Sequence, residues 1–220
     1  SAALRWGLAI SGSLLFFLSV LAHELAHSLV AQSRGMSVRS IRLHLFGGVS
    51  NIQREPDSPG AEFVMAILGP VTSLVIGGVL LLVIGLTAQV GGLDSPREAL
   101  SQLNPAVTIL AWLGSVNVVL GIFNLIPGFP LDGGRVLRSI IWAITDNLTK
   151  ATRWASWTGR GIAWLMIFGG IASVFGFSIP LLNGGGISGL WLAFIGWFLH
   201  NAAVQSYRQL VVRDALDDVA

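Results

Sequence analysis

The stretch LAISGSLLFFLSVLAHELAHSLV, residues 8–30, decides the fold of this chain. It is apolar over more than the about 20 residues that a helix needs to cross a bilayer. Its one charged side chain is Glu24, and it also carries His23 and His27. The stretch therefore predicts a transmembrane helix with ionisable groups inside the membrane, where such groups are costly and are candidates for function.

Further apolar blocks follow this helix. Residues 63–93, 99–131 and 161–207 contain no Lys, Arg, Asp or Glu. The last block is too long for one span, and Pro180 and the run NGGG at 183–186 break it, so it predicts two helices. With 53% hydrophobic and 11% charged residues, residues 1–220 are predicted to form a single all-α, multi-pass membrane domain with about five transmembrane helices.

The basic residues lie singly between these spans, so no basic run predicts binding of nucleic acid. They gather after the first span, after the third span and in the C-terminal tail, whereas the opposite side keeps only Arg5 and Arg97. The positive-inside rule therefore predicts that these segments face the cytoplasm and that the N-terminus lies outside. The chain contains no Cys, which excludes disulfides and thiolate ligands.

A short β-hairpin is predicted directly after the first helix. Apolar and polar residues alternate along 41–45, and Gly47 and Gly48 permit a tight turn. Residues 49–53 then return as the partner strand. Between two membrane helices, this hairpin is expected to be associated with the membrane.

The sequence HELAH at 23–27 has the spacing of a zinc site on a helix. His23 and His27 are four residues apart and project from one face, while Glu24 is offset beside them. In such a site two imidazoles bind zinc, and the carboxylate takes a proton from the attacking water and passes it to the leaving amine. The alternative is structural: a His–Glu hydrogen bond that joins two helices.

A catalytic zinc usually takes three protein ligands, and Asp132 is the outstanding candidate for the third. It lies three residues before Arg135, at the predicted cytoplasmic end of the third span, and His27 lies seven residues before Arg34, at the same end of the first. At about 1.5 Å per residue, both lie within about 10 Å of one interface. Asp132 could instead cap a helix that starts at Gly133, or pair with Arg135.

Four segments carry a resemblance to a known family: HELAH at 23–27, FGGVSN at 46–51, Gly69-Pro70, and NLIPGFPLDGGR at 124–135. Together they resemble the site-2 protease family of intramembrane zinc metalloproteases. The likeness spans about residues 8–138, and its last motif is highly specific. It implies a catalytic core over these residues, with supporting helices at about 150–210.

The resemblance implies Zn²⁺ held by His23, His27 and Asp132, with Glu24 as the general base. It also implies that Asn124 lies near the substrate carbonyl, where a neutral amide can donate to developing negative charge. Alternatively, Asn124 only closes the broken end of its helix.

The resemblance also ties one loop to substrate handling: Gly47, Gly48, Val49, Ser50 and Asn51. A plain turn is the alternative. A helical substrate hides its carbonyls, so it must unwind, and its freed backbone groups then need partners inside the membrane. A strand edge within 41–51 could supply these partners by strand addition, with 49–51 as the preferred edge.

These observations predict an intramembrane zinc endopeptidase, embedded in the lipid bilayer of a prokaryotic cell membrane. It is expected to cut single-span membrane proteins, such as membrane-anchored signalling factors, near the cytoplasmic side. A membrane metal transporter and a non-catalytic helix-binding protein are the alternatives. A transporter needs polar sites along a translocation path, whereas the polar sites of this chain cluster in one leaflet. The intact Glu24 argues against a non-catalytic helix-binding protein. The family's first helix and the regulatory C-terminal domains of some members are expected to be absent.

Overall fold

The computed structural model describes residues 2–36, 38–44, 47–52, 56–90, 105–177 and 185–217, with side chains described outside 37–55, 88–104, 178–185 and 209–220. Two compact units make up the chain. The first contains Ser1–Asp57 and Val64–Asn124, and the second contains Ser58–Phe63 and Leu125–Ala220. Helix α2 (Pro59–Val90) thus contributes its first turn to the second unit and the rest of its length to the first.

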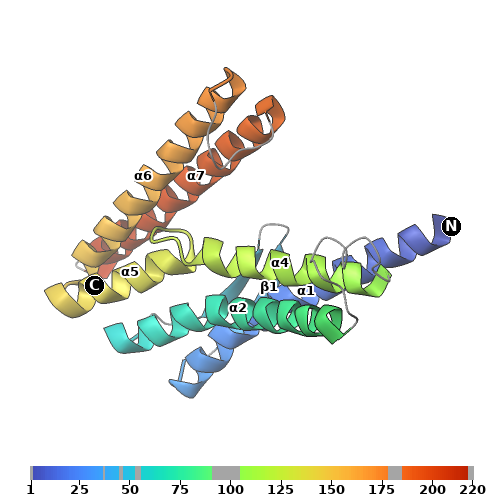
Figure 1. Ribbon diagram of the computed structural model, residues 1–220. Helices are drawn as coiled ribbons and strands as arrows, with labels where there is room; N and C mark the ends of the chain where they lie inside the picture. Colours follow the sequence, from blue (N-terminus) through green and yellow to red (C-terminus); the bar gives the residue numbers. More distant parts are fainter. Residues whose placement is uncertain are drawn as a thin grey trace. The chain divides into compact units, whose positions relative to one another are not determined.

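Three long helices dominate the first unit (Figure 1): α1 (Ala2–Ser33), α2 and α4 (Pro105–Asn124). Apolar stretches of this length favour helix because a helix satisfies its own backbone N–H and C=O groups away from water. A Cβ at Gly77 would lie 2.7 Å from the carbonyl oxygen of Gly114, and one at Gly121 would lie 3.0 Å from that of Pro70. The glycines therefore allow α2 and α4 to approach closely, as small residues do in membrane helix pairs.

Helix α1 ends at a glycine turn. Gly35 has a φ of 77°, which favours glycine, and its N–H donates to the Gln32 carbonyl at 2.9 Å. The Met36 N–H donates to the Ala31 carbonyl at 3.0 Å, which completes a Schellman motif. Met36 and Ala31 are buried together with Met65 of α2. The turn therefore fixes the end of α1 against α2.

Strands β1 (Val38–His44) and β2 (Gly47–Ile52) form an antiparallel pair after α1. Ile41 lies opposite Ser50 in the ladder. Both strands contact α1. In the described part of the chain the sheet contains these two strands, so each has a second edge that is not paired with a strand.

Helices α5 (Asp132–Thr145), α6 (Leu148–Val174) and α7 (Gly185–Asp217) form most of the second unit. Helices α6 and α7 lie side by side (Figure 1). A Cβ at Gly189 would lie 2.5 Å from the Gly170 carbonyl oxygen, and one at Gly196 would lie 2.7 Å from that of Ala163. Since the later residue of α7 meets the earlier residue of α6, the two helices run antiparallel.

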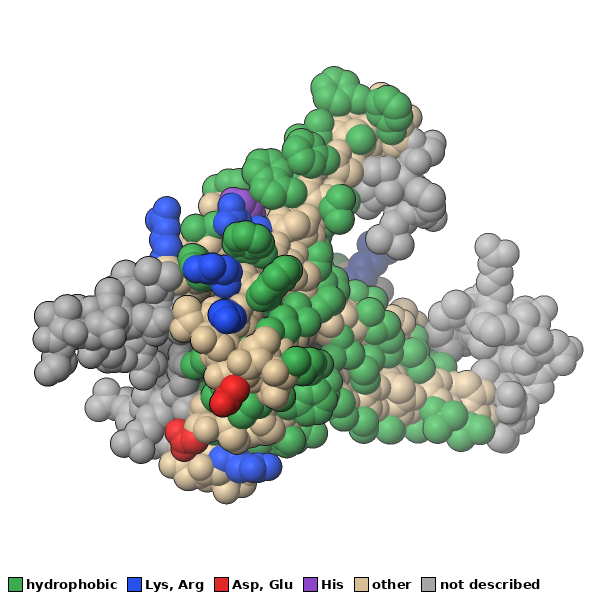
Figure 2. Space-filling view, turned by 90° about the vertical axis from the view of Figure 1, so that its left-hand side faces the viewer, with side chains coloured by type: hydrophobic (Ala, Val, Ile, Leu, Met, Phe, Trp, Pro, Cys, Tyr) green, Lys and Arg blue, Asp and Glu red, His purple; other side chains and the backbone are tan. Residues whose placement is uncertain are grey.

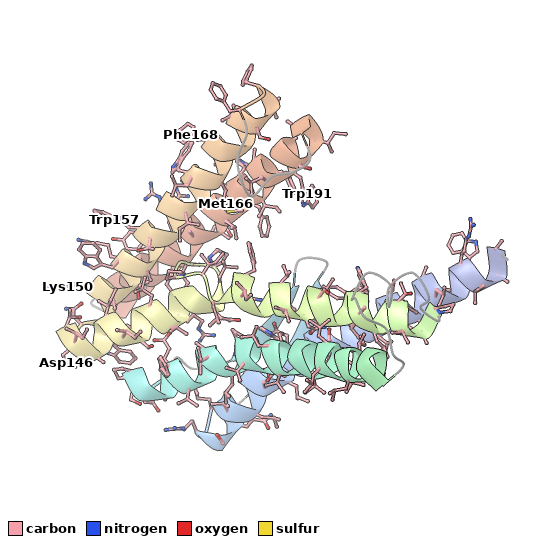
Figure 3. The ribbon with its side chains drawn as sticks, in the orientation of Figure 1. Asp146, Lys150, Trp157, Met166, Phe168 and Trp191 are labelled. Carbon is pink, nitrogen blue, oxygen red and sulfur yellow. The ribbon has the colours of Figure 1, made fainter. Side chains whose placement is uncertain are left out.

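The side chains of α6 change in character along its length (Figure 3). The helix starts at a capping Asn147, whose Oδ1 accepts the Lys150 N–H at 2.8 Å. Asp146 and Lys150 mark this polar end, whereas Trp157 and Phe168 project outward farther along. Trp157 is 58% exposed and Phe168 is 62% exposed. Exposed aromatic side chains of this kind suit contact with lipid.

Four helices of the described chain are long and apolar enough to span a membrane: Ala2–Ser33, Pro59–Thr87, Pro105–Asn124 and Gly186–Arg208. Helix α6, which carries Arg160 within its length, is not among them. Large apolar side chains are exposed on these helices. Hydrophobic side chains are also widespread on the face of the molecule seen in Figure 2. Such a surface faces lipid rather than water. The chain is therefore a multi-pass integral membrane protein. Of the about five spans predicted from the sequence, four correspond to helices that are both long enough and apolar enough to cross a membrane.

Candidate metal centre

His23 and His27 turn their rings toward each other from one face of α1. Both are buried, with 4% and 5% of their surface exposed. Their Nε2 atoms are 3.2 Å apart. Two nitrogens bound at about 2.05 Å to a tetrahedral zinc would be about 3.3 Å apart. The pair therefore has the spacing of two ligands of one zinc ion.

The outer nitrogens of both rings have partners on α2. Nδ1 of His27 lies 2.6 Å from the Met65 carbonyl oxygen. Since a carbonyl only accepts, this Nδ1 carries the hydrogen, and the neutral ring presents a lone pair at Nε2. Nδ1 of His23 lies 2.9 Å from the Ser73 hydroxyl oxygen, which can accept in the same way. Such contacts orient metal-binding imidazoles and fix their tautomers.

One face of α2 is shaped to fit the histidine pair. Met65, Gly69 and Ser73 are four residues apart and so lie on the same side of the helix. A Cβ at Gly69 would overlap Nε2 of His27 and lie 2.7 Å from Nε2 of His23. The sequence alone does not predict the contacts of Met65 and Ser73 with the two histidines. The four-residue spacing of Met65, Gly69 and Ser73 indicates that they share one face of α2. Nothing in the sequence indicates that this face packs against α1.

Glu24 follows His23 on α1 and is also buried, at 8% exposure. Its backbone carbonyl accepts a hydrogen bond from the Ser28 hydroxyl at 3.0 Å. Glu24 thus belongs to the buried residues of α1 and is next in sequence to His23. A buried acid beside paired imidazoles is the arrangement that base-assisted hydrolysis requires.

Asn124 is the last residue of α4 and is half-buried. Its Nδ2 donates to the carbonyl oxygen of Leu120 at 3.1 Å, within its own helix. The Leu120 carbonyl is also the acceptor of the Asn124 backbone N–H in the helical ladder. The bond therefore holds the Asn124 side chain along its own helix.

Asp132 is the first residue of α5, in the second unit. The residue at the N-cap is Leu131, whose side chain makes no capping hydrogen bond, and the helix starts at Asp132 itself rather than at Gly133. A Cβ at Gly133 would overlap the carbonyl oxygens of the preceding loop, so the loop packs tightly against the helix start. The Asp132 carboxylate and the imidazoles of His23 and His27 are all donor groups of the kind that bind zinc.

A buried ion pair lies near the start of α5. Glu62, in the first turn of α2, is fully buried, and its Oε1 accepts hydrogen bonds from Nε of Arg138 at 2.7 Å and from Nη2 of the same residue. Arg135 Nε lies 3.8 Å from the same oxygen. The Arg138 guanidinium also lies over the Phe129 ring, 5.5 Å from its centroid. The sequence places Glu62 at a helix start but gives no sign of these partners.

The predicted substrate segment, Gly47 to Asn51, lies in β2, opposite residues of β1. Its backbone is extended. Its side chains lie outside the described part of the structure.

The chain is similar to several known proteins. The model of Peptidase family M50 matches residues 11–103 and 89–168. A candidate zinc metalloprotease of Synechocystis sp., sll0528, is 42% identical over 212 residues, which cover 96% of this chain and 51% of that protein. The zinc metalloprotease MJ0392 of Methanocaldococcus jannaschii is 37% identical over 161 residues, 73% of this chain and 43% of that protein.

Among solved structures, the site-2 protease from Methanocaldococcus jannaschii aligns with a TM-score of 0.63 and 31% sequence identity. The alignment covers 88% of this chain and 76% of that one. The chain spans about half the length of the curated relatives that it matches.

Proposed function

Because this chain belongs to peptidase family M50, we propose that it is the membrane-embedded catalytic part of a zinc endopeptidase of the site-2 type. It hydrolyses peptide bonds of transmembrane proteins. The observation that carries the proposal is the buried pair of His23 and His27, whose Nε2 atoms are 3.2 Å apart and whose outer nitrogens have partners on α2. The relatives named above are described as zinc metalloproteases and a site-2 protease, which supports the same activity.

Zinc is held by His23, His27 and Asp132. Two neutral imidazoles and one carboxylate suit zinc, and three protein ligands leave a fourth position for water or substrate. The histidine geometry fits this metal, as the Nε2 separation shows. When bound to these residues, zinc would supply Lewis-acid chemistry, that is, activation of water and polarisation of the scissile carbonyl.

Glu24 acts as the general base and then as the general acid. Its position next to His23 on the buried face of α1 suits a group that takes a proton from attacking water. The protonated carboxyl then gives the proton to the departing amine nitrogen. Asn124 donates through Nδ2 to the developing oxyanion, for which it exchanges its bond to the Leu120 carbonyl.

The substrate is a single-span membrane protein, such as a membrane-anchored signalling factor, and it binds as an extended strand. The second edge of β2, at residues 47–51, supplies backbone partners to the unwound segment. The β1–β2 hairpin is accordingly associated with the membrane. Its two-stranded ladder supports this proposal because a third strand can join either edge.

The two units together form one protease domain over residues 1–220, with α6 as a fifth span. The antiparallel partner of α6 is α7, which is itself long and apolar enough to cross a membrane. The active site faces the cytoplasm of a prokaryotic cell, and the basic segments after the first and third spans support this orientation.

The test is purification in detergent, followed by metal analysis and incubation with single-span substrates. We expect about one zinc per chain, cleavage that a chelator stops and zinc restores, and no cleavage by Glu24→Gln with zinc retained. Replacing the base should lower the rate by a factor of about 10² to 10⁴. Full activity of Glu24→Gln would refute the mechanism, and zinc transport without cleavage would favour a transporter.

A further inference from the structure

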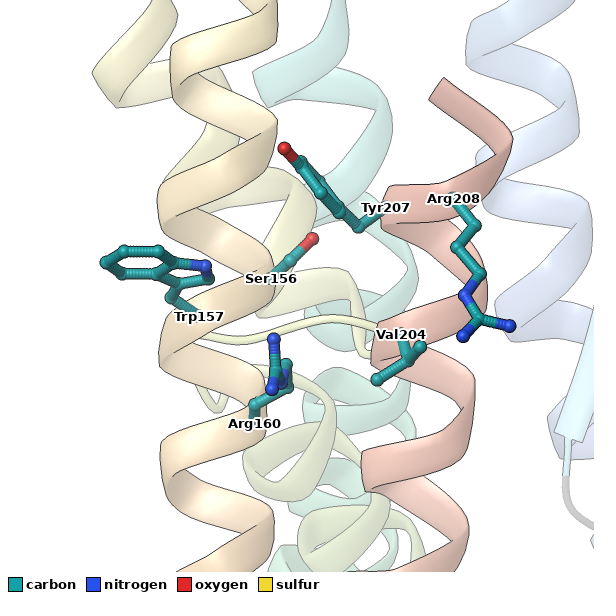
Figure 4. A pocket seen from close by; sticks show the side chains of 6 residues that line it. All are labelled: Ser156, Trp157, Arg160, Val204, Tyr207 and Arg208. Atoms are coloured by element: carbon teal, nitrogen blue, oxygen red, sulfur yellow. The ribbon is translucent and has the colours of Figure 1, made fainter. Parts of the chain in front are cut away.

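A hollow between α6 and α7 combines basic, aromatic and hydroxyl groups (Figure 4). Its volume is about 340 Å³, and its lining residues are Ser156, Trp157, Arg160, Val204, Tyr207 and Arg208. Tyr207 leans from α7 toward α6, and the Ser156 hydroxyl turns toward it. The lining contains two arginines and no carboxylate, so the hollow favours an anion.

The Ser156 hydroxyl has no hydrogen-bond partner, although this residue is 1% exposed. Other helical hydroxyls behave differently: those of Thr152 and Thr158, on the same helix, donate to backbone carbonyls four residues earlier. A buried polar group without a partner is unfavourable. Ser156 is therefore a donor in the floor of the hollow that remains available to a ligand.

The hollow lies where α6 passes from charged to uncharged sequence. Arg160 is the last charged residue of α6, and the remainder of the helix, residues 161–174, contains none and extends about 21 Å. That length covers about two thirds of the about 30 Å of a bilayer's hydrocarbon core. On α7, Arg208 is the first charged residue after an uncharged stretch that includes 186–207. The hollow is therefore expected at the level of the lipid headgroups.

A second hollow of about 360 Å³ adjoins the other side of Arg160, between Trp157 and Trp164. Trp157 and Trp164 are exposed, at 58% and 44%. Trp rings are enriched at the membrane interface, where their apolar bodies contact acyl chains and their N–H groups face headgroups. Arg160 thus lines both hollows, and Trp side chains line each of them as well.

We propose that this region binds one anionic phospholipid, with its phosphate at Arg160 between α6 and α7. Arg160 pairs with the phosphate, and the Ser156 and Tyr207 hydroxyls donate to its oxygens. Arg208 also lines the hollow and adds positive charge there. The acyl chains run along the Trp157 and Trp164 side of α6. Basic pockets between transmembrane helices recognise lipid headgroups in this way.

The test is native mass spectrometry of the delipidated, detergent-purified chain with dioleoylphosphatidylglycerol. Dioleoylphosphatidylcholine, which has the same acyl chains, is the neutral comparison. We expect the anionic lipid to bind at least about tenfold more tightly, and Arg160→Gln to remove most of that difference, as expected for one charge-assisted hydrogen-bond pair. Arg153→Gln is the matched control, because Arg153 is an exposed cation of the same helix that does not line either hollow.

Ser156→Ala should lower the affinity for the anionic lipid by about threefold and leave helix content unchanged, since it removes a donor without adding volume. Equal binding of the two lipids would overturn the proposal, as would equal losses in Arg160→Gln and Arg153→Gln. Displacement of the lipid by millimolar inorganic phosphate would also overturn it, because the site would then recognise a free anion. Circular dichroism checks that each variant is folded.

Discussion

Gly69 of α2 lies so close to His27 of α1 that a Cβ at Gly69 would overlap the ring Nε2 atom. The same Cβ would lie 2.7 Å from Nε2 of His23. These are the two nitrogens that face each other in the histidine pair. The packing of α2 on α1 therefore depends, at this one position, on a residue without a side chain.

We predict that Gly69→Ala strongly reduces zinc binding. The new methyl group must displace one or both imidazoles from the positions in which their nitrogens face a shared ion. The helix itself should remain, because Ala favours helix over Gly by about 1 kcal/mol. Zinc per chain, measured by mass spectrometry, should fall well below that of the parent protein.

Gly78→Ala is the matched control for this substitution. It makes the same change in the same helix, at a position where a Cβ would have no neighbour within 4 Å. Its zinc content should equal that of the parent protein. Normal zinc content in Gly69→Ala would mean that the histidine rings can move away without loss of the site.

Ser73→Ala should weaken zinc binding by about tenfold, the lower end of the range for partners of metal ligands. The substitution removes the hydroxyl that lies 2.9 Å from Nδ1 of His23, so this ring loses its orientation and its preferred tautomer. Competition with a fluorescent zinc chelator measures the affinity. Thr72→Ala should have no such effect, since the Thr72 hydroxyl donates to the Leu68 carbonyl within α2.

The sequence predicts the metal ligands more readily than their supports. His23, Glu24 and His27 are found because a four-residue spacing fixes their common face before any tertiary contact forms. Met65 and Ser73 act through α2, and which face of an apolar helix meets α1 depends on packing that no local pattern encodes. Similarly, the sequence shows that Glu62 lies at the start of an apolar helix, where an acidic residue is favourable. Its ion pair with Arg138 joins residues 76 positions apart, and no local pattern predicts such a contact.

Asp132→Asn should reduce zinc affinity by about 100-fold or more, because it replaces an anionic ligand with a neutral one. The start of α5 should persist, since Asp132 does not provide its N-cap. The affinity assay used for Ser73 applies here too. Asp146→Asn is the control: it makes the same change at the other end of α5, in a left-handed conformation that Asn tolerates. Unchanged zinc affinity in Asp132→Asn would exclude this residue as a ligand.

Proline substitutions along β2 should impair cleavage at alternate positions. In an antiparallel pair, successive residues turn their N–H groups toward the partner strand and away from it. Of Val49 and Ser50, one therefore offers its N–H to the second edge. Proline there should reduce the rate of substrate cleavage much more than alanine does, in protein that retains zinc. Equal rates for proline and alanine at Val49, Ser50 and Asn51 would mean that this edge does not bind substrate.

The ion pair of Glu62 and Arg138 should show strong coupling in a double-mutant cycle. Glu62 is fully buried and the Arg138 side chain is 9% exposed, so removing one partner leaves the other charge with much less compensation. Glu62→Met should therefore destabilise the chain by about 3 to 5 kcal/mol. Because Met has no charge and a long side chain, the double variant Glu62→Met with Arg138→Met should recover much of that loss. Unfolding in mixed detergent micelles measures the four free energies.

Arg135 makes the expected cycle asymmetric. Its Nε lies 3.8 Å from Oε1 of Glu62, so in Arg138→Met a second cation remains beside the buried carboxylate. In Glu62→Met, by contrast, Arg138 keeps its contact with the Phe129 ring, and a cation over a desolvated aromatic face gains about 2 kcal/mol. Glu62→Met should therefore cost more stability than Arg138→Met. If the losses of the single variants simply add in the double variant, the two residues do not stabilise the junction of α2 and α5 as a pair.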